Sequence, residues 1–165
     1  MVKTDNKNRP DEAWKYPYVA GAFDFGSNFT VRTKHTEDSS FGIIISPQIL
    51  FDSTDAAVLG FIDEFCMNHG IEPRLREQEA NYRLSITARD YVRDFLQLIR
   101  PYVLSRSPEV EILLDDLIPA LENRAQSTEE GMLEVMGYVD EIRKHTVQRR
   151  EPKYTQDYFR QQFNL

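Results

Sequence analysis

The sequence predicts an α+β fold in which helices cover one face of an antiparallel sheet. Two patterns lead to this prediction: apolar residues recur every three or four positions in some segments and every second position in others. These segments follow one another as helix, two strands, helix, two strands, helix, and further helices come after them. The chain has 165 residues, of which 41% are hydrophobic, and is long enough to bury a core as one domain.

The first helix is expected over residues 11–25. Pro17 suits a first helical turn, and Gly26 and Ser27 end the helix. Residues 1–10 are polar and are expected to be disordered. They contain no hydrophobic signal region. The chain also has no run of about 20 apolar residues, the length needed to span a bilayer. We therefore expect a cytoplasmic protein that does not contact a membrane.

Two hairpins and two helices follow, because the period of the apolar residues changes twice more. In the first hairpin, Phe29, Val31 and Thr33 point to one face of the sheet and their neighbours to the other. The expected elements, in order, are strands at 28–35 and 41–47, a helix at 54–69 capped by Ser53 or Thr54, strands at 71–77 and 81–86, and a helix at 87–99.

The rest of the chain reads as a helical extension. Amphipathic helices are expected at 109–121 and 129–144, and the aromatic end, 148–165, is expected to form a short helix that docks on the body. The predicted division is a disordered segment at 1–10, a domain at 11–104 that contains the sheet, and a packed helical extension at 105–165.

The polar face of the predicted sheet is basic although the whole chain has a net charge of −7. Its strand residues include five basic side chains against Glu72 alone. A basic sheet face suits phosphates, and arginine can form bidentate hydrogen bonds with guanine. The alternative is an ordinary solvated sheet with surface arginines. The candidate DNA-binding residues are Thr30, Arg32, Lys34, Arg74, Arg76, Arg83 and Ser85.

The second strand fits this surface less well, because residues 43–45 are all isoleucine. Ile44 would share the polar face. Its side chain is suited to touch a thymine methyl group, or else this edge is covered by something other than DNA.

Residues 19–27 read VAGAFDFGS, an apolar helix with an Ala-Gly step that ends abruptly. Small residues let two backbones approach closely. The segment resembles the LAGLIDADG motif of homing endonucleases. A single domain of that family has the same helix-strand-strand order that periodicity predicts here for residues 11–100. Motif and order therefore agree.

The resemblance implies a saddle-shaped protein that binds double-stranded DNA. In the family, two motif helices pair at the centre, and single-motif members are homodimers. It therefore implies a homodimer through the motif helix, with Ala20, Gly21 and Phe23 at the interface and a roughly palindromic target. The alternative is that Ala20 and Gly21 pack against a neighbouring helix of the same chain.

The family's catalytic acid is missing. Aligned without gaps, Asp24 takes the first acidic position and Gly26 the second, which in the family holds the divalent metal. If one residue is deleted, Gly26 and Ser27 match the Gly-Ser that follows the metal ligand. Either alignment removes the carboxylate, so we predict no catalytic residue, no metal and no cofactor. Asp24 is then a vestige or a residue that orients the helix end.

The leading prediction is a DNA-binding protein that does not cleave, such as a transcription regulator. One alternative is an active site-specific endonuclease that uses Mg²⁺ and another carboxylate, such as Asp24 or Glu77. Another is a protein-interaction module formed by residues 109–145 and the aromatic end, and an RNA target is also open. The three histidines are scattered and Cys66, the single cysteine, is expected in the core, so zinc is not expected.

Overall fold

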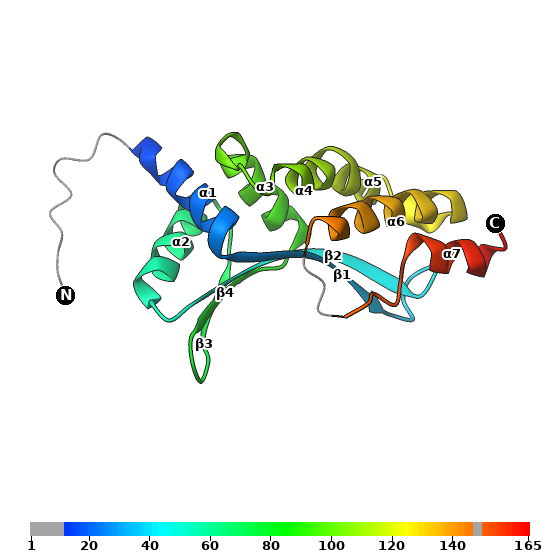
Figure 1. Cartoon of the computed structure of the whole chain (residues 1–165), viewed down its shortest axis with the longest axis horizontal. Helices are drawn as coiled ribbons and strands as arrows, with labels where there is room; N and C mark the ends of the chain where they lie inside the picture. Colours follow the sequence, from blue (N-terminus) through cyan, green and yellow to red (C-terminus); the bar gives the residue numbers. More distant parts are fainter. Residues whose placement is uncertain (1–11, 147–149) are drawn as a thin grey trace, which may run out of the picture.

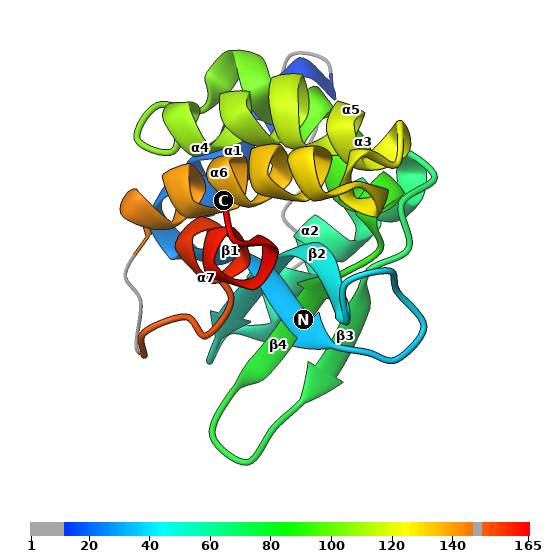
Figure 2. The ribbon, with the colours of Figure 1, turned by 90° about the vertical axis from the view of Figure 1, so that its right-hand side faces the viewer.

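The computed structural model describes residues 12–146 and 150–165 and confirms the predicted α+β architecture. A four-stranded antiparallel sheet forms one layer, and helices form a second layer on one of its faces (Figures 1 and 2). The stretch 1–10, for which disorder is expected, lies outside the described residues. No helix within the described part is long and apolar enough to cross a bilayer.

The first part of the chain has the predicted order of elements. A 3₁₀ turn at Glu12–Trp14 precedes the regular helix, which therefore begins after residue 11. The elements are α1 (Lys15–Gly26), β1 (Ser27–His35), β2 (Ile43–Ser53), α2 (Ala56–Asn68), β3 (Arg74–Glu77), β4 (Tyr82–Ile86) and α3 (Arg89–Ile99), which is followed by the 3₁₀ turn η2 (Arg100–Tyr102).

β2 departs most from its predicted bounds, because it covers 43–53 and not 41–47. Pro47 lies inside the strand, opposite Val31 of β1. Pairing with β4 begins only at Ile49, so Pro47 has a neighbouring strand on one side alone. Its missing N–H therefore breaks no ladder on the other side, and the strand continues through it.

The predicted cap of α2 is also wrong. Asp55 caps the helix, since its Oδ1 accepts a hydrogen bond from the N–H of Ala57 at 2.9 Å. Ser53 instead accepts from the N–H of Asp55 through its Oγ at 3.0 Å. The N-cap of α2 therefore lies one residue after Thr54, the later of the two predicted caps.

The sheet has the order β1-β2-β4-β3. Its inner face, which the helices cover, carries Phe29 and Val31 of β1, Phe51 of β2 and Leu84 of β4, all buried. This confirms the predicted assignment of the alternating residues to the two faces. The opposite face carries no helix of the described chain (Figures 1 and 2), and we call it the open face.

The C-terminal part adds helices to the same layer. A continuous helical run consists of α4 (Ser107–Glu111), the π-helical stretch η3 (Ile112–Leu117) and α5 (Ile118–Glu122). Pro119 in this run has no N–H to donate to residue 115, and the N–H of Ile118 reaches back five residues to Leu113. The 3₁₀ turn η4 (Ala125–Ser127), α6 (Glu129–Lys144) and α7 (Gln156–Phe163) complete the chain.

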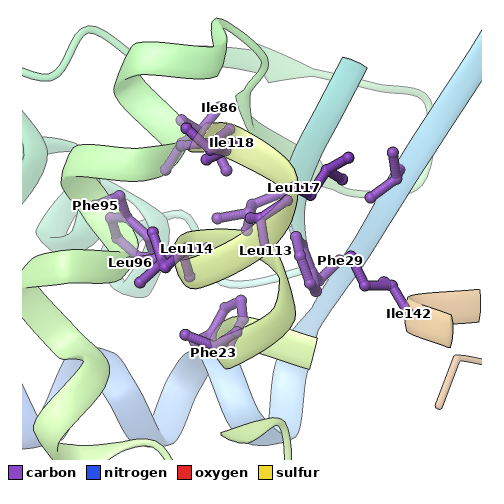
Figure 3. Packing of buried hydrophobic residues seen from close by; sticks show 14 of the residues in the cluster. Phe23, Phe29, Ile86, Phe95, Leu96, Leu113, Leu114, Leu117, Ile118 and Ile142 are labelled. Carbon is purple, nitrogen blue, oxygen red and sulfur yellow. The ribbon is translucent and has the colours of Figure 1, made fainter. Parts of the chain in front are cut away.

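One hydrophobic core joins the sheet to both sets of helices. Phe23 of α1 and Phe95 of α3 pack with Phe29 of β1 and with Leu113 and Leu117 of η3 (Figure 3). The final helix docks as expected, with the ring of Phe163 centred 4.9 Å from that of Phe41, which lies in the turn before β2. Cys66 is fully buried, as predicted.

Candidate nucleic-acid interface

The arginines of the open face surround a common hollow of about 430 Å³. It is lined by Arg32 of β1, Arg74 and Arg76 of β3, and Arg83 and Ser85 of β4. β1 and β3 are the two outermost strands of the sheet, and a flat sheet would keep them well apart. The side chains of both strands nevertheless reach one hollow, so the open face is concave at the level of its side chains.

A second, smaller hollow of about 250 Å³ continues the first one along β1 and β2. Arg32 and Gln48 line both hollows, and Lys34 and Ile44 join them in the second. Thr30 lies beside them, because its Oγ1 accepts a hydrogen bond from Nε2 of Gln48 at 3.3 Å. The seven residues expected at a DNA surface therefore lie on one face.

Most of these cations have no carboxylate partner. Arg83 does: its Nε and Nη2 donate to the two carboxylate oxygens of Asp52 at 2.7 and 2.9 Å, and this pairing raises the pKa of Arg83. Within the described residues, no ion pair is made by Arg32, Lys34, Arg74 or Arg76. Four free positive charges thus converge on a concave surface.

Three β2 residues of this surface were missed by the sequence prediction. Gln48, Leu50 and Asp52 lie on the open face of β2, in the part of the strand beyond its predicted end. Their alternation with the buried Ile49 and Phe51 was the signal that could have found them.

Asp24, at the end of α1, has its carboxylate occupied by a neighbouring loop. Oδ2 accepts from the N–H of Leu104 at 2.7 Å, and Oδ1 accepts from Ser105 Oγ and the N–H of Arg106, both at 3.1 Å. These bonds fix the segment that leads into α4. Gly26, two residues on, is exposed and offers no side chain.

A polar hollow of about 540 Å³ lies next to this helix end. It is lined by Asp24, Asp52, Glu109 and His145, together with backbone and side chains of the neighbouring loops. Glu109 is only 3% exposed, and its Oε2 has no hydrogen-bond partner. In the described residues, no three His, Cys, Asp or Glu side chains are placed to hold a metal ion. Glu77, on β3, does not line this hollow.

The residues that α1 exposes on its outer face are not the ones predicted at the dimer interface. Ala20 and Phe23 are 0% exposed and pack in the core of their own chain, so they cannot touch a second one (Figure 3 shows Phe23). Only Gly21 of the three is exposed. The exposed side of α1 instead presents Tyr18 and Phe25, and Phe25 is 98% exposed.

An apolar hollow of about 500 Å³ adjoins these exposed residues. Tyr18, Gly21 and Phe25 border it on α1, and Val58 and Ile62 border it on α2. Exposed apolar surface next to an apolar depression is typical of an interaction site.

Comparison with known proteins finds similarity in the fold. No protein-family model and no curated protein matches the sequence. The homing endonuclease I-CvuI in complex with the I-CreI target has a TM-score of 0.79 at 13% identity, over 92% of this chain and 94% of that one. The archaeal intron-encoded homing endonuclease I-Vdi141I, complexed with DNA, has a TM-score of 0.76 at 19% identity, over 90% and 94%. The group I intron-encoded homing endonuclease I-CeuI, also complexed with DNA, has 0.73 at 20%, over 92% and 76%.

These likenesses confirm the fold expected from the order of elements and from residues 19–27. The chain has the architecture of the LAGLIDADG homing endonucleases, and the likeness extends into its C-terminal helices, since it covers nine-tenths of the chain.

Proposed function

We propose that the protein binds double-stranded DNA on the open face of its sheet, as a homodimer, without cutting it, and that it serves as a regulator. The observation that carries the proposal is the convergence of Arg32, Arg74 and Arg76 on one hollow, free of carboxylates, in a chain of net charge −7. A concave cationic surface suits the phosphates and base edges of a duplex. Structures of similar fold were solved with DNA bound.

The proposal that the protein does not cleave rests on two residues at the end of α1. Metal-assisted hydrolysis needs carboxylate oxygens that hold a divalent ion. Gly26 has none to offer where the resemblance places the metal ligand. The oxygens of Asp24 already accept three hydrogen bonds from residues 104–106, which leaves little of the carboxylate's acceptor capacity for a metal.

A mobility-shift titration with a mixture of random duplexes tests DNA binding. If the four free cations of each of two chains neutralise one phosphate each, affinity falls about 10⁴-fold between 50 and 200 mM salt. An affinity that is absent at micromolar protein, or indifferent to salt, would contradict the proposal.

Charge reversal locates the surface. The variant Arg74→Glu/Arg76→Glu should weaken binding about 100-fold or more, because two cations of each chain become anions that repel phosphate. The matched control Lys144→Glu/Arg160→Glu makes the same change of charge on exposed sites of α6 and α7. If both variants bind equally weakly, net charge alone is responsible and the open face is not the binding surface.

The dimer is proposed to form through the outer face of α1. Tyr18, Gly21 and Phe25 are spaced by three and four residues, so they form one stripe along the helix. A two-fold axis would place the exposed ring of Phe25 against the apolar hollow of a second copy, since both features belong to the same face.

Sedimentation equilibrium tests this interface. Wild type should be a dimer at micromolar concentration, and Phe25→Asp should be monomeric and folded, because that side chain touches little of its own chain. Met67→Asp, on an exposed position of α2, is the control and should remain dimeric. A wild type that stays monomeric, with or without DNA, would remove the dimer from the proposal.

A cleaving enzyme is the second candidate, and one juxtaposition favours it. Asp52 and Asp24 line the same polar hollow at the end of α1. Incubation of a library of duplex sites with Mg²⁺ or Mn²⁺ distinguishes the two functions. Reproducible cleavage that is abolished in both Asp24→Asn and Asp52→Asn would replace the binding-only proposal.

A further inference from the structure

The cations of the open face are not spread evenly over its strands. β1 contributes Arg32 and Lys34, and β3 contributes Arg74 and Arg76, and these are the two outermost strands. The inner strand β2 contributes no cation: its open-face residues are Ile44, Ser46, Gln48, Leu50 and Asp52. The inner strand β2 therefore separates two strands that carry positive charge.

Asp52 increases the difference in free charge between the inner and the outer strands. It neutralises Arg83, the only cation on the other inner strand, through two hydrogen bonds of 2.7 and 2.9 Å. Arg83 lies opposite Asp52 in the β2–β4 register, so the pair sits on the inner strands themselves. Free charge then remains on the outer strands alone.

Two branched apolar side chains lie on the open face of β2: Leu50 where β2 has a strand on each side, and Ile44 before the pairing with β4 begins. Ile44 is 49% exposed and lines the hollow that contains Arg32 and Lys34. Leu50 is partly exposed and lines the hollow that contains the arginines of β3. These exposed apolar side chains do not contribute to the core, because the core lies on the other face of the sheet.

We infer that β2 reads thymine methyl groups in the major groove, with Ile44 and Leu50 against the methyls, while the outer strands hold the phosphates. The inference rests on the proposed function. Thymine is the base that presents a methyl group in the major groove, and apolar side chains recognise it there. Gln48, between the two, has the side chain that pairs with adenine N6 and N7 and would extend the preference to A·T pairs.

A methyl reader also separates DNA from RNA. Uracil lacks the methyl group, and the deep, narrow major groove of an A-form helix excludes side chains. The same surface should therefore prefer a DNA duplex to an RNA duplex of the same sequence.

The experiment begins with duplexes selected from a random library for binding to the full-length protein. The best duplex is then made with deoxyuridine in place of every thymidine in the bound segment, which removes only methyl groups. We expect wild type to bind the deoxyuridine duplex about fourfold more weakly for each methyl group that β2 recognises, and the RNA duplex more weakly still. Equal affinity for the thymidine and deoxyuridine duplexes would overturn the inference.

Variants assign the effect to β2. Ile44→Ala and Leu50→Ala should each bind the thymidine duplex more weakly and reduce its advantage over the deoxyuridine duplex. Met67→Ala removes an exposed apolar side chain from α2 and should retain the full advantage. Circular dichroism and thermal unfolding verify that each variant is folded. An advantage that Ile44→Ala/Leu50→Ala leaves intact would place methyl recognition elsewhere and overturn the assignment.

The outcome is separable from that of the proposed function. If no duplex is retained in the selection, the proposed DNA binding fails. If duplexes are retained and bind with strong salt dependence but without any effect of the methyl group, DNA binding stands and the inference about β2 fails.

Discussion

Arginines of the helical layer make ion pairs with carboxylates of other helices, whereas three of the four arginines of the open face make none within the described residues. In the helical layer, Arg93 pairs with Glu122 at 2.7 Å, and Arg100 donates to Asp115 at 2.8 Å. Each of these pairs joins α3 or its end to the C-terminal helices. On the open face, Arg32 and Arg74 have no such partner among the described residues. The arginines of the helical layer therefore stabilise the fold, whereas the unpaired arginines of the open face are available to bind a ligand.

The largest expected effect concerns Arg143, the most enclosed of the ion-paired arginines of the helical layer. It donates to Asp140 Oδ1 at 3.1 Å, to the carbonyl of Tyr154 at 2.7 Å and to Thr33 Oγ1 at 3.0 Å, so it joins α6 to β1 and to the segment before α7. Arg143→Ala should lower the free energy of unfolding by about 3 kcal/mol, because partly buried acceptors are left without their donor. Urea denaturation measures the change.

Arg160→Ala is the control for this variant. Arg160 pairs with Asp157 at 3.3 Å on the exposed side of α7, and such pairs contribute less than about 1 kcal/mol. Folded Arg143→Ala should bind DNA like wild type. A large drop in DNA affinity at unchanged stability would contradict the separation of the two kinds of arginine.

The next expected effect concerns a buried residue of the helical layer, Cys66, whose ionisation makes the stability of the fold depend on pH. Burial, with a smaller contribution from Asp63, raises the pKa of its thiol to about 12, from about 9 for the unfolded chain. The thiol therefore favours folding fully below pH 9, and this contribution is lost as pH rises toward 12. Between pH 8 and 10 the loss is about 1.4 kcal/mol.

The measurement compares unfolding of wild type and Cys66→Ala at both pH values. The variant starts from a lower stability because of the small cavity it leaves, yet its stability should fall about 1.4 kcal/mol less between pH 8 and 10. Parallel curves would show that the thiol is accessible to water in the folded protein.

The alternation of residues along the strands was enough to predict the two faces of the sheet. Arg32, Arg74 and Arg83 each lie one residue away from an apolar residue of the opposite face, and that spacing assigns the face without knowledge of the fold. The order of the elements then predicts that both hairpins share one sheet. What the alternation cannot give is the pairing register, so the sequence did not predict the Asp52–Arg83 ion pair.

The rest depended on the tertiary context. Pro47 ends a strand only if strands flank it on both sides, and here β4 pairs farther along. The outer face of α1 could not be identified either, because Tyr18 and Phe25 are aromatic or apolar like the buried Val19 and Phe23. A helix that is apolar all round has no periodicity to show which side turns outward.

A moderate effect is expected from the carboxylate on the open face. Asp52→Asn removes the charge that neutralises Arg83, so the free cations per chain increase by one. Affinity for random duplexes should rise about fivefold at low salt. The salt dependence of the affinity should become steeper by the amount that corresponds to about one more phosphate contact per chain. The control Asp157→Asn, on α7, frees Arg160 instead and should leave both quantities unchanged. Weaker binding by Asp52→Asn would show that the pair itself touches the DNA.

The smallest effect compares two helical glycines, Gly21 on the exposed side of α1 and Gly60 on α2. A Cβ added at Gly21 or at Gly60 meets nothing within 4 Å, so alanine fits both sites in the single chain. Each substitution should raise the unfolding free energy by about 0.5 to 1 kcal/mol, because glycine is unfavourable inside a helix. Sedimentation equilibrium then separates them: Gly21→Ala should weaken the proposed dimer by crowding two close helices, whereas Gly60→Ala should not. If both variants dimerise like wild type, the motif helices do not approach each other at Gly21, and the outer face of α1 needs another partner.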